Sequence, residues 1–226
     1  MDIIHLIPGV LLYYLCFIPV LTFHEFAHAW VAWKCGDDTA KKLGRVSLNP
    51  IVHMEWIGTV VLPLLAIFLQ MKGSAVGGFI IGWGKPVPVD PSNLRSARRD
   101  DTLIALAGPG MNLILAFLLT GTAVLGMLMV TRNIAPGFGA ILRALSENLV
   151  WVNLSLAFFN MIPIPPLDGS HVVKNLVNMS YETYWRLTQY GFFAIILVIN
   201  VPGVRLTMAQ LMRTTHLWML RAYGLG

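Results

Sequence analysis

The sequence is short of charged residues. They make up only 12% of its 226 positions, whereas about a quarter of the residues of a soluble globular domain are charged. Hydrophobic residues make up 56%, and several apolar runs approach the roughly 18–20 residues that a helix needs to cross a bilayer. The composition therefore excludes an ordinary soluble domain and predicts an integral membrane protein.

Cysteine is scarce as well, with Cys16 in an apolar run and Cys35 beside a glycine. Two scattered cysteines make neither a disulfide framework nor a cysteine-based zinc knuckle. Internal repeats and low-complexity segments are also absent, and the length suits a single membrane domain over residues 1–226. We expect a catalytic core at about 3–180, followed by a C-terminal span and tail at 184–226. The net charge of +5 suits anionic lipid headgroups rather than nucleic acid.

The apolar segments are the main structural signal. A shorter apolar segment, 57–71, contains Pro63, and residues 73–91 after it carry the glycines and β-branched residues of a hairpin or extended loop. The tail at 205–223 is amphipathic and suits a membrane interface. Four segments are long enough to cross a bilayer, at about 3–33, 102–131, 140–162 and 184–201. We therefore predict an all-α multi-pass membrane protein with about four transmembrane helices, a re-entrant segment and a membrane-associated β-hairpin or extended loop.

The first apolar segment contains the stretch LTFHEFAHAW, residues 21–30, in which ionisable side chains interrupt the hydrophobic run. Such side chains are costly inside a membrane and usually mark function. His24, Glu25 and His28 match the pattern H-E-x-x-H. Residues four apart leave the same face of a helix, so both imidazoles can bind one metal ion while Glu25 acts as general base toward a metal-bound water. Catalytic Zn²⁺ takes three protein ligands, so a third ligand is required.

Asp168 is the best candidate for the third ligand. It follows three prolines in PIPPLDGS, residues 163–170, which cannot continue a helix. Non-helical backbone at membrane depth is tolerated only inside protein or beside a water-filled cavity. A role as N-cap of a helix starting at Ser170 is an alternative and compatible reading. The other candidates are Asp37 and Asp38, which suit a solvated or capping role, and His53, Glu55 and His171.

Two asparagines and a histidine complete the set of candidates. Asn160 begins the proline-rich break, and Asn112 lies inside the second predicted span. Either amide can hold a substrate backbone or stabilise an oxyanion, although hydrogen bonding between helices explains each of them equally well. His171 follows Asp168 by three positions and is a candidate to support a metal ligand from behind.

The topology must bring Asp168 to the depth of His24 and His28. The connections at 34–55 and 85–99 are both basic, so the positive-inside rule places both on the cytoplasmic side. Residues 57–71 must then enter and leave the membrane on the same side, because a full crossing would put Asp168 at the opposite face. A metal site built from these residues therefore predicts that 57–71 is re-entrant.

Several motifs together resemble the site-2 protease family of intramembrane zinc metalloproteases, in its compact branch without PDZ or CBS domains. They are HEFAH, LNPIVH, GWGKPVPVDP, AGPGMN and NMIPIPPLDG, between about residues 20 and 175. The resemblance implies that His24, His28 and Asp168 bind zinc, that Glu25 is the base and that Asn160 positions substrate. It also implies that residues 76–88 form a hairpin that engages substrate. Glu55, in place of an aspartate, and His171 depart from the family pattern.

We therefore expect a membrane protease with one zinc ion per chain, which cleaves transmembrane protein substrates in or near the bilayer. It is expected in a prokaryotic cell membrane, with its active site toward the cytoplasm and no nucleic-acid partner. One alternative is a zinc hydrolase of a lipid or another non-protein amide or ester. Another is a metal transporter or sensor, against which Glu25 argues, because transport needs no base beside the histidine pair. The sequence carries no signal for the oligomeric state.

Overall fold

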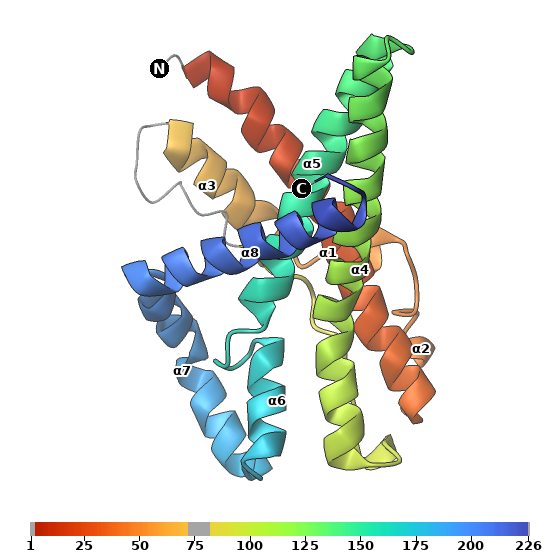
Figure 1. The fold of residues 1–226 in the computed structure, drawn as a ribbon. Helices are drawn as coiled ribbons and strands as arrows, with labels where there is room; N and C mark the ends of the chain where they lie inside the picture. The colour runs from red at the N-terminus through yellow and green to blue at the C-terminus, as the bar shows by residue number, and fades with distance from the viewer. Residues whose placement is uncertain (1–2, 72–81, 226) are drawn as a thin grey trace.

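A computed structural model describes residues 3–71 and 82–225 (Figure 1). Every regular element within these ranges is a helix. In chain order they are α1 (Ile3–Cys35), α2 (Thr39–Lys42), η1 (Pro50–Val52), η2 (Trp56–Val61), α3 (Leu62–Met71), η4 (Pro91–Asn93), α4 (Ala97–Thr131), α5 (Pro136–Asn160), α6 (Asp168–Leu176), α7 (Tyr181–Ile199) and α8 (Pro202–Ala222).

The centre of the molecule is an antiparallel pair, α4 and α5, against which α1 packs (Figure 1). Phe17 and Leu21 of α1 are buried with Val152 of α5 in one apolar cluster. Near the turn that connects them, α4 and α5 contact each other through glycines. A Cβ at Gly126 of α4 would come within 2.7 Å of the carbonyl oxygen of Gly139 of α5. Small residues let helix backbones approach closely where lipid offers no hydrophobic driving force.

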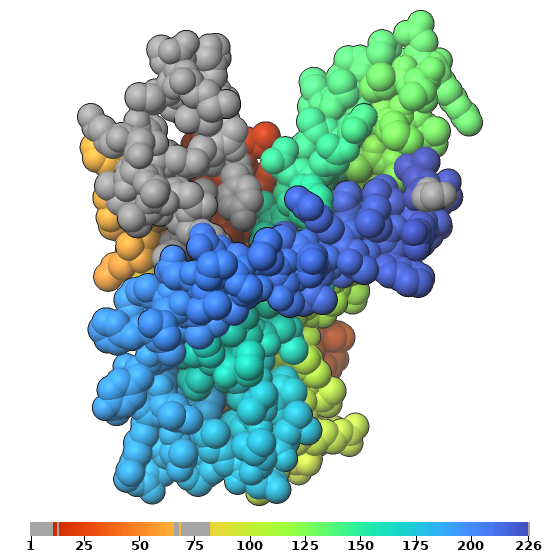
Figure 2. Space-filling model, turned by 60° about the vertical axis from the view of Figure 1, so that its left-hand side comes forward, coloured from red at the N-terminus to blue at the C-terminus, as the bar shows by residue number. Residues whose placement is uncertain are grey.

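The C-terminal helices lie against this pair. Figure 2 shows α8 as a band across one face of the molecule, with α7 below it. Met219 of α8 is buried with Ala116 of α4 and Leu154 of α5. The two helices meet at an angle of 80°, because Pro202 begins α8 and has no N–H with which to continue α7.

The expected number of about four transmembrane helices is wrong. Within the described residues two helical stretches are long and apolar enough to cross a membrane, Tyr14–Cys35 and Ala97–Thr131, and a third if α7 and α8 form one broken span. The predicted span at 140–162 corresponds to α5, which does not qualify. Polar residues on α5, among them the ion-paired Arg143 and Glu147, lower its hydropathy.

The prediction of a membrane-associated β-hairpin over residues 73–91 is also wrong where the structure describes that segment, at residues 82–91. Residues 72–81 lie outside the described residues. Residues 82–90 contain neither strand nor helix. They are attached by separate hydrogen bonds, in which the N–H of Trp83 donates to Gly58 O and that of Lys85 donates to His53 O. Pro86 and Pro88 have no N–H, which prevents a regular strand ladder here.

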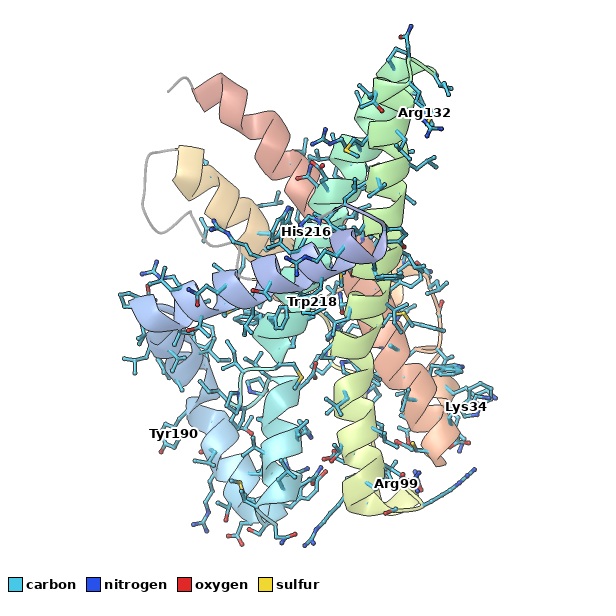
Figure 3. The ribbon with its side chains drawn as sticks, viewed as in Figure 1. Lys34, Arg99, Arg132, Tyr190, His216 and Trp218 are labelled. Atoms are coloured by element: carbon cyan, nitrogen blue, oxygen red, sulfur yellow. The ribbon has the colours of Figure 1, made fainter. Side chains whose placement is uncertain are left out.

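These attachments have a topological consequence. The chain leaves the bundle at His53 and η2, and it returns to the same place at Trp83 and Lys85. Lys34 and Arg99 lie toward one end of the molecule, and Arg132 lies at the other (Figure 3). A chain that returns where it left is what a re-entrant segment requires, whereas its position in a bilayer stays a prediction.

The shared end can be tested by labelling single cysteines introduced at Lys34, Arg99 and Arg132 in a chain whose two native cysteines are replaced. A membrane-impermeant maleimide applied to one side of sealed vesicles should label the first two positions together and the third only from the opposite side. Labelling of positions 34 and 99 from opposite sides would contradict this topology.

Candidate metal centre

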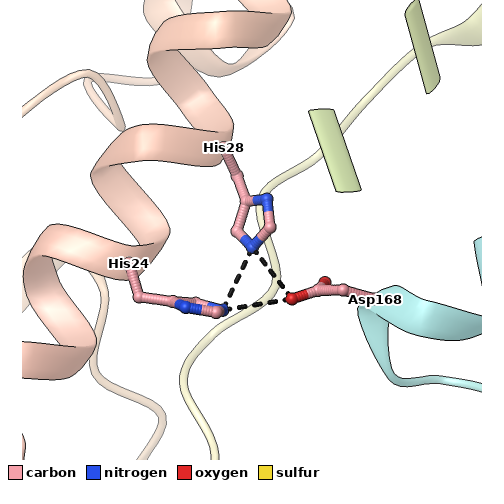
Figure 4. A group of neighbouring side chains, drawn as sticks. All are labelled: His24, His28 and Asp168. Carbon is pink, nitrogen blue, oxygen red and sulfur yellow. Dashed lines mark hydrogen bonds and ion pairs between the residues drawn. The ribbon is translucent and has the colours of Figure 1, made fainter. Parts of the chain in front are cut away.

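Two helices bring three potential metal ligands together (Figure 4). His24 and His28 lie one turn apart on α1, with their Nε2 atoms 3.1 Å from each other. Asp168 begins α6, and its Oδ2 lies 3.3 Å from His24 Nε2 and 3.4 Å from His28 Nε2. The three atoms form a nearly equilateral triangle in the interior, since both histidines are buried.

The proline-rich break sets the position of Asp168. The chain ends α5 at Asn160 and turns through the break, so that α6 starts at Asp168 with Leu167 as its N-cap residue. Asp168 is therefore the first helical residue and not the cap of a helix that starts at Ser170. A Cβ at Gly169 would meet the carbonyl oxygen of Met161 at 2.3 Å, so this tight contact between α6 and the end of α5 requires glycine.

Hydrogen bonds fix the orientation of both imidazoles. His24 Nδ1 lies 2.6 Å from Asn112 Oδ1, and His28 Nδ1 lies 2.7 Å from the carbonyl oxygen of Ile104. Both partners are acceptors, so each ring donates its Nδ1–H and turns the lone pair of Nε2 toward Asp168. Metal-binding histidines are oriented in this way by their outer partners.

Asn112 belongs to a longer chain of hydrogen bonds. Its Nδ2 donates to Asn153 Oδ1 at 3.0 Å, and Asn153 Nδ2 donates in turn to the carbonyl oxygen of Leu149. Both asparagine side chains are fully buried. Asn112, predicted as a substrate or oxyanion residue, thus lies behind His24 and links α1 to α4 and α5.

Gly108 of α4 leaves the space that the histidine pair occupies. A Cβ at this position would come within 2.3 Å of His28 Nε2 and 2.7 Å of His24 Nε2. The next residue, Pro109, lies inside the same helix. The motif AGPG thus lets a long helix pass directly against the imidazoles, a role that the sequence analysis did not assign to it.

The geometry of the triangle fits a metal ion. Two ligands bound at 2.0–2.1 Å to tetrahedral zinc lie about 3.3 Å apart, close to the distances between His24, His28 and Asp168. Asp168 Oδ2 is buried without a hydrogen-bond donor. Two imidazole lone pairs and a carboxylate that face one another repel unless a cation lies between them, and two histidines with one carboxylate are a known catalytic zinc set.

Glu25 shares a cavity of about 660 Å³ with the three predicted ligands. The extended segment 82–90 passes directly over it, since a Cβ at Gly84 would lie 3.0 Å from Glu25 Oε1. One face of α7 lines the same cavity, with Tyr184, Thr188 and Phe192 among its residues. The general-base candidate therefore faces a largely apolar cavity beside the triangle.

The other third-ligand candidates lie outside the triangle and have other partners. His53 Nε2 bonds to the carbonyl oxygen of Ser47, and Glu55 caps η2 by accepting the N–H of Gly58. Asp38 pairs with Lys42. Burial alone would raise the pKa of Asp37, but hydrogen bonds from Thr39, Asp90 and Asn93 bring this pKa below its usual value.

Asn160 and His171 both line the cavity. Asn160 donates one N–H to the carbonyl oxygen of Leu156. His171, predicted to support a metal ligand, instead bonds to Asp101 of α4 at 3.1 Å. Asp101 was not predicted, because it ends the charged run LRSARRDD, which suggests an exposed connection; in the folded chain it is buried.

Comparison with known proteins gives the family. The sequence model of the family described as Peptidase family M50 matches residues 12–199 of the chain. The chain belongs to this family. The match confirms the resemblance to the site-2 proteases drawn from the motifs, and together with the apolar helices it identifies a membrane protein.

Relatives in several bacteria align with most of the chain. "Putative zinc metalloprotease YwhC" of Bacillus subtilis is 37% identical over 80% of this chain and 76% of its own length. Two proteins named "Putative zinc metalloprotease Rip2", of Mycolicibacterium smegmatis and Mycobacterium tuberculosis, are 29% and 32% identical over 81% and 79% of the chain. The alignments cover 64% and 61% of those two relatives, less than two thirds of their length. No solved structure matches the chain significantly.

Substitution of Gly108 by alanine should disrupt the centre. The added methyl group would force the imidazoles apart, and overpacking of this kind costs about 1–3 kcal/mol. Zinc titration of the purified variant should show at least a tenfold loss of affinity. Gly110→Ala is the matched control, because nothing lies within 4 Å of a Cβ there. Equal zinc affinity in the two variants would show that the close contact at Gly108 does not matter for metal binding.

Removal of the Asn112 amide should weaken metal binding without touching a ligand. Asn112→Ala leaves the Nδ1–H of His24 buried without its acceptor, and loss of such outer partners typically costs about 10–100-fold in metal affinity. Asn148→Ala is the control, because the amide of Asn148 is exposed and bonds only to Ala144 O on its own helix. Indistinguishable zinc affinities for these two variants would show that the hydrogen-bond chain has no such role.

Proposed function

We propose that this member of family M50 is a zinc endopeptidase that hydrolyses peptide bonds in or near transmembrane segments of membrane proteins. The observation that carries the proposal is the triangle of His24, His28 and Asp168 with Glu25 in the same cavity. The relatives are each named "Putative zinc metalloprotease", which agrees with this chemistry.

The three ligands would hold one zinc ion per chain. When bound there, zinc would polarise a substrate carbonyl and lower the pKa of a water molecule to about 7. Glu25, which follows His24 directly in the chain, would act as the general base and take a proton from the water molecule that attacks the carbonyl carbon. Glu25 then delivers the proton to the departing amide nitrogen, so the same carboxylate serves both halves of the hydrolysis.

The cavity suits an apolar peptide in an extended conformation. Its lining includes Phe192, Ile195 and Ile196 of α7, next to the polar residues of the site. A helical substrate hides its carbonyls in backbone hydrogen bonds, so a transmembrane helix must unwind locally before Glu25 and the metal can act on it.

The basic residues suggest an orientation. The end that carries Lys34 and Arg99 (Figure 3) faces the cytoplasm in our proposal, because positively charged connections are retained on that side. The whole chain then acts as one membrane domain whose partners are lipid and a transmembrane protein, without nucleic acid. Asn160, which lines the cavity, would hold the substrate backbone.

Glu25→Gln tests the mechanism. The amide cannot accept the proton of water, so cleavage of a transmembrane reporter should fall by at least about 100-fold while zinc content stays at one per chain. Glu147→Gln is the control, because Glu147 pairs with Arg143 on the surface of α5. Cleavage by Glu25→Gln at the control rate would refute the role of Glu25.

The same preparations should be incubated with membrane lipids and, separately, with the reporter in liposomes. The proposal requires that peptide bonds are cut and that the lipids stay intact. Lipid hydrolysis without reporter cleavage would instead identify a lipid hydrolase, and zinc uptake into liposomes without any hydrolysis would identify a transporter.

A further inference from the structure

His171 lies one helical turn after Asp168 on α6. Residues three apart lie on the same face of a helix, and both side chains line the cavity that contains Glu25. The proposed mechanism assigns no task to His171. A histidine that lines the same cavity as Glu25 and lies outside the triangle is a candidate for a second role in catalysis.

A buried acid orients this histidine. His171 Nδ1 bonds to Asp101 Oδ1 at 3.1 Å, and the ring packs against Tyr184 with centroids 5.0 Å apart. The carboxylate can only accept, so His171 donates its Nδ1–H. The Nε2 atom is then the nitrogen available to a molecule in the cavity, and it carries a hydrogen when the ring is the imidazolium partner of the Asp101 carboxylate.

Asp101 does not depend on His171 for its position. Its Oδ2 accepts from Lys174 Nζ at 2.8 Å and from Asn175 Nδ2 at 2.7 Å. Lys174 is buried, with 4% of its side chain exposed. Two further residues of α6 therefore hold that helix to α4, so the contact between the helices does not explain why a histidine occupies position 171.

We propose that His171 is a further catalytic residue, whose Nε2–H donates a hydrogen bond to the carbonyl oxygen of the scissile peptide bond. As the oxygen of water bonds to the carbonyl carbon, the π electrons of the carbonyl move to its oxygen, and His171 stabilises this charge while keeping its proton. This inference rests on the proposed peptidase function. Asn112, a sequence-based candidate for the same task, lies behind His24 and bonds to Asn153.

Two substitutions separate this role from a structural one. In His171→Asn the side-chain amide replaces Nδ1 and keeps the bond to Asp101, but nothing replaces Nε2. In His171→Gln the amide nitrogen reaches the position of Nε2. Loss of one oxyanion donor typically costs about 100–1,000-fold in kcat, so His171→Asn should show that loss with unchanged KM, zinc content and melting temperature, and His171→Gln should recover at least tenfold.

Binding provides a test that does not depend on turnover. A peptide phosphonate carries charged oxygens that mimic the tetrahedral reaction centre, whereas a substrate peptide does not. Affinity for the phosphonate should fall about 100-fold in zinc-loaded His171→Asn, because its Nε2 donor is lost. Affinity for the substrate peptide, measured in a Glu25→Gln background, should stay within threefold.

Asn175→Ala is the structural control, since it removes one bond to Asp101 and leaves His171 in place. The inference is overturned if His171→Asn keeps kcat and phosphonate affinity within threefold of the wild type, or if Asn175→Ala loses as much of both. If the wild type cuts no reporter, the proposed function fails, and the phosphonate affinities still decide the role of His171. If His171→Asn does not fold, His171→Ala replaces it in the kcat and phosphonate measurements.

Discussion

The structure depends on one electrostatic constraint. Two imidazole lone pairs and a carboxylate oxygen point at a common centre in a buried setting, with 3.1–3.4 Å between them. Such a group repels itself unless a cation lies between its members, and a buried charge without a partner costs several kcal/mol. The fold must therefore hold α1 and α6 at a fixed separation, although they are far apart in the chain.

Three local features maintain that separation. Gly108 lets α4 approach the histidines so closely that Asn112 Oδ1 and the carbonyl oxygen of Ile104 can accept their Nδ1–H groups. The proline-rich break ends α5, and Gly169 lets α6 start against it. Asp101 then ties α6 back to α4 through His171, Lys174 and Asn175. Each feature is either a close contact between backbones or a buried hydrogen bond or ion pair. Each therefore restricts which residue type can occupy its position.

The sequence could predict the candidate site better than the fold around it. H-E-x-x-H is a local pattern whose geometry follows from the helix period, and three prolines with a glycine mark a break wherever they occur. The number of spans was wrong because polar residues such as Arg143 and Glu147 lower the hydropathy of α5 below that of a span, and α7 qualifies only together with α8. The prediction of a β-hairpin was wrong for residues 82–90. Glycines and β-branched residues indicate extended backbone, but Pro86 and Pro88 have no N–H for the hydrogen bonds between paired strands.

The sequence by itself determined the chemistry: a membrane chain, a histidine pair with an adjacent carboxylate, and a distant aspartate after a rigid break. Only the tertiary structure decided which candidates meet. It separated His53 and Glu55 from the triangle, placed Asn112 behind His24 and gave His171 the buried partner Asp101. The reason is physical, since spacing along one helix is set by its period, whereas contacts between helices depend on how closely their backbones can pack.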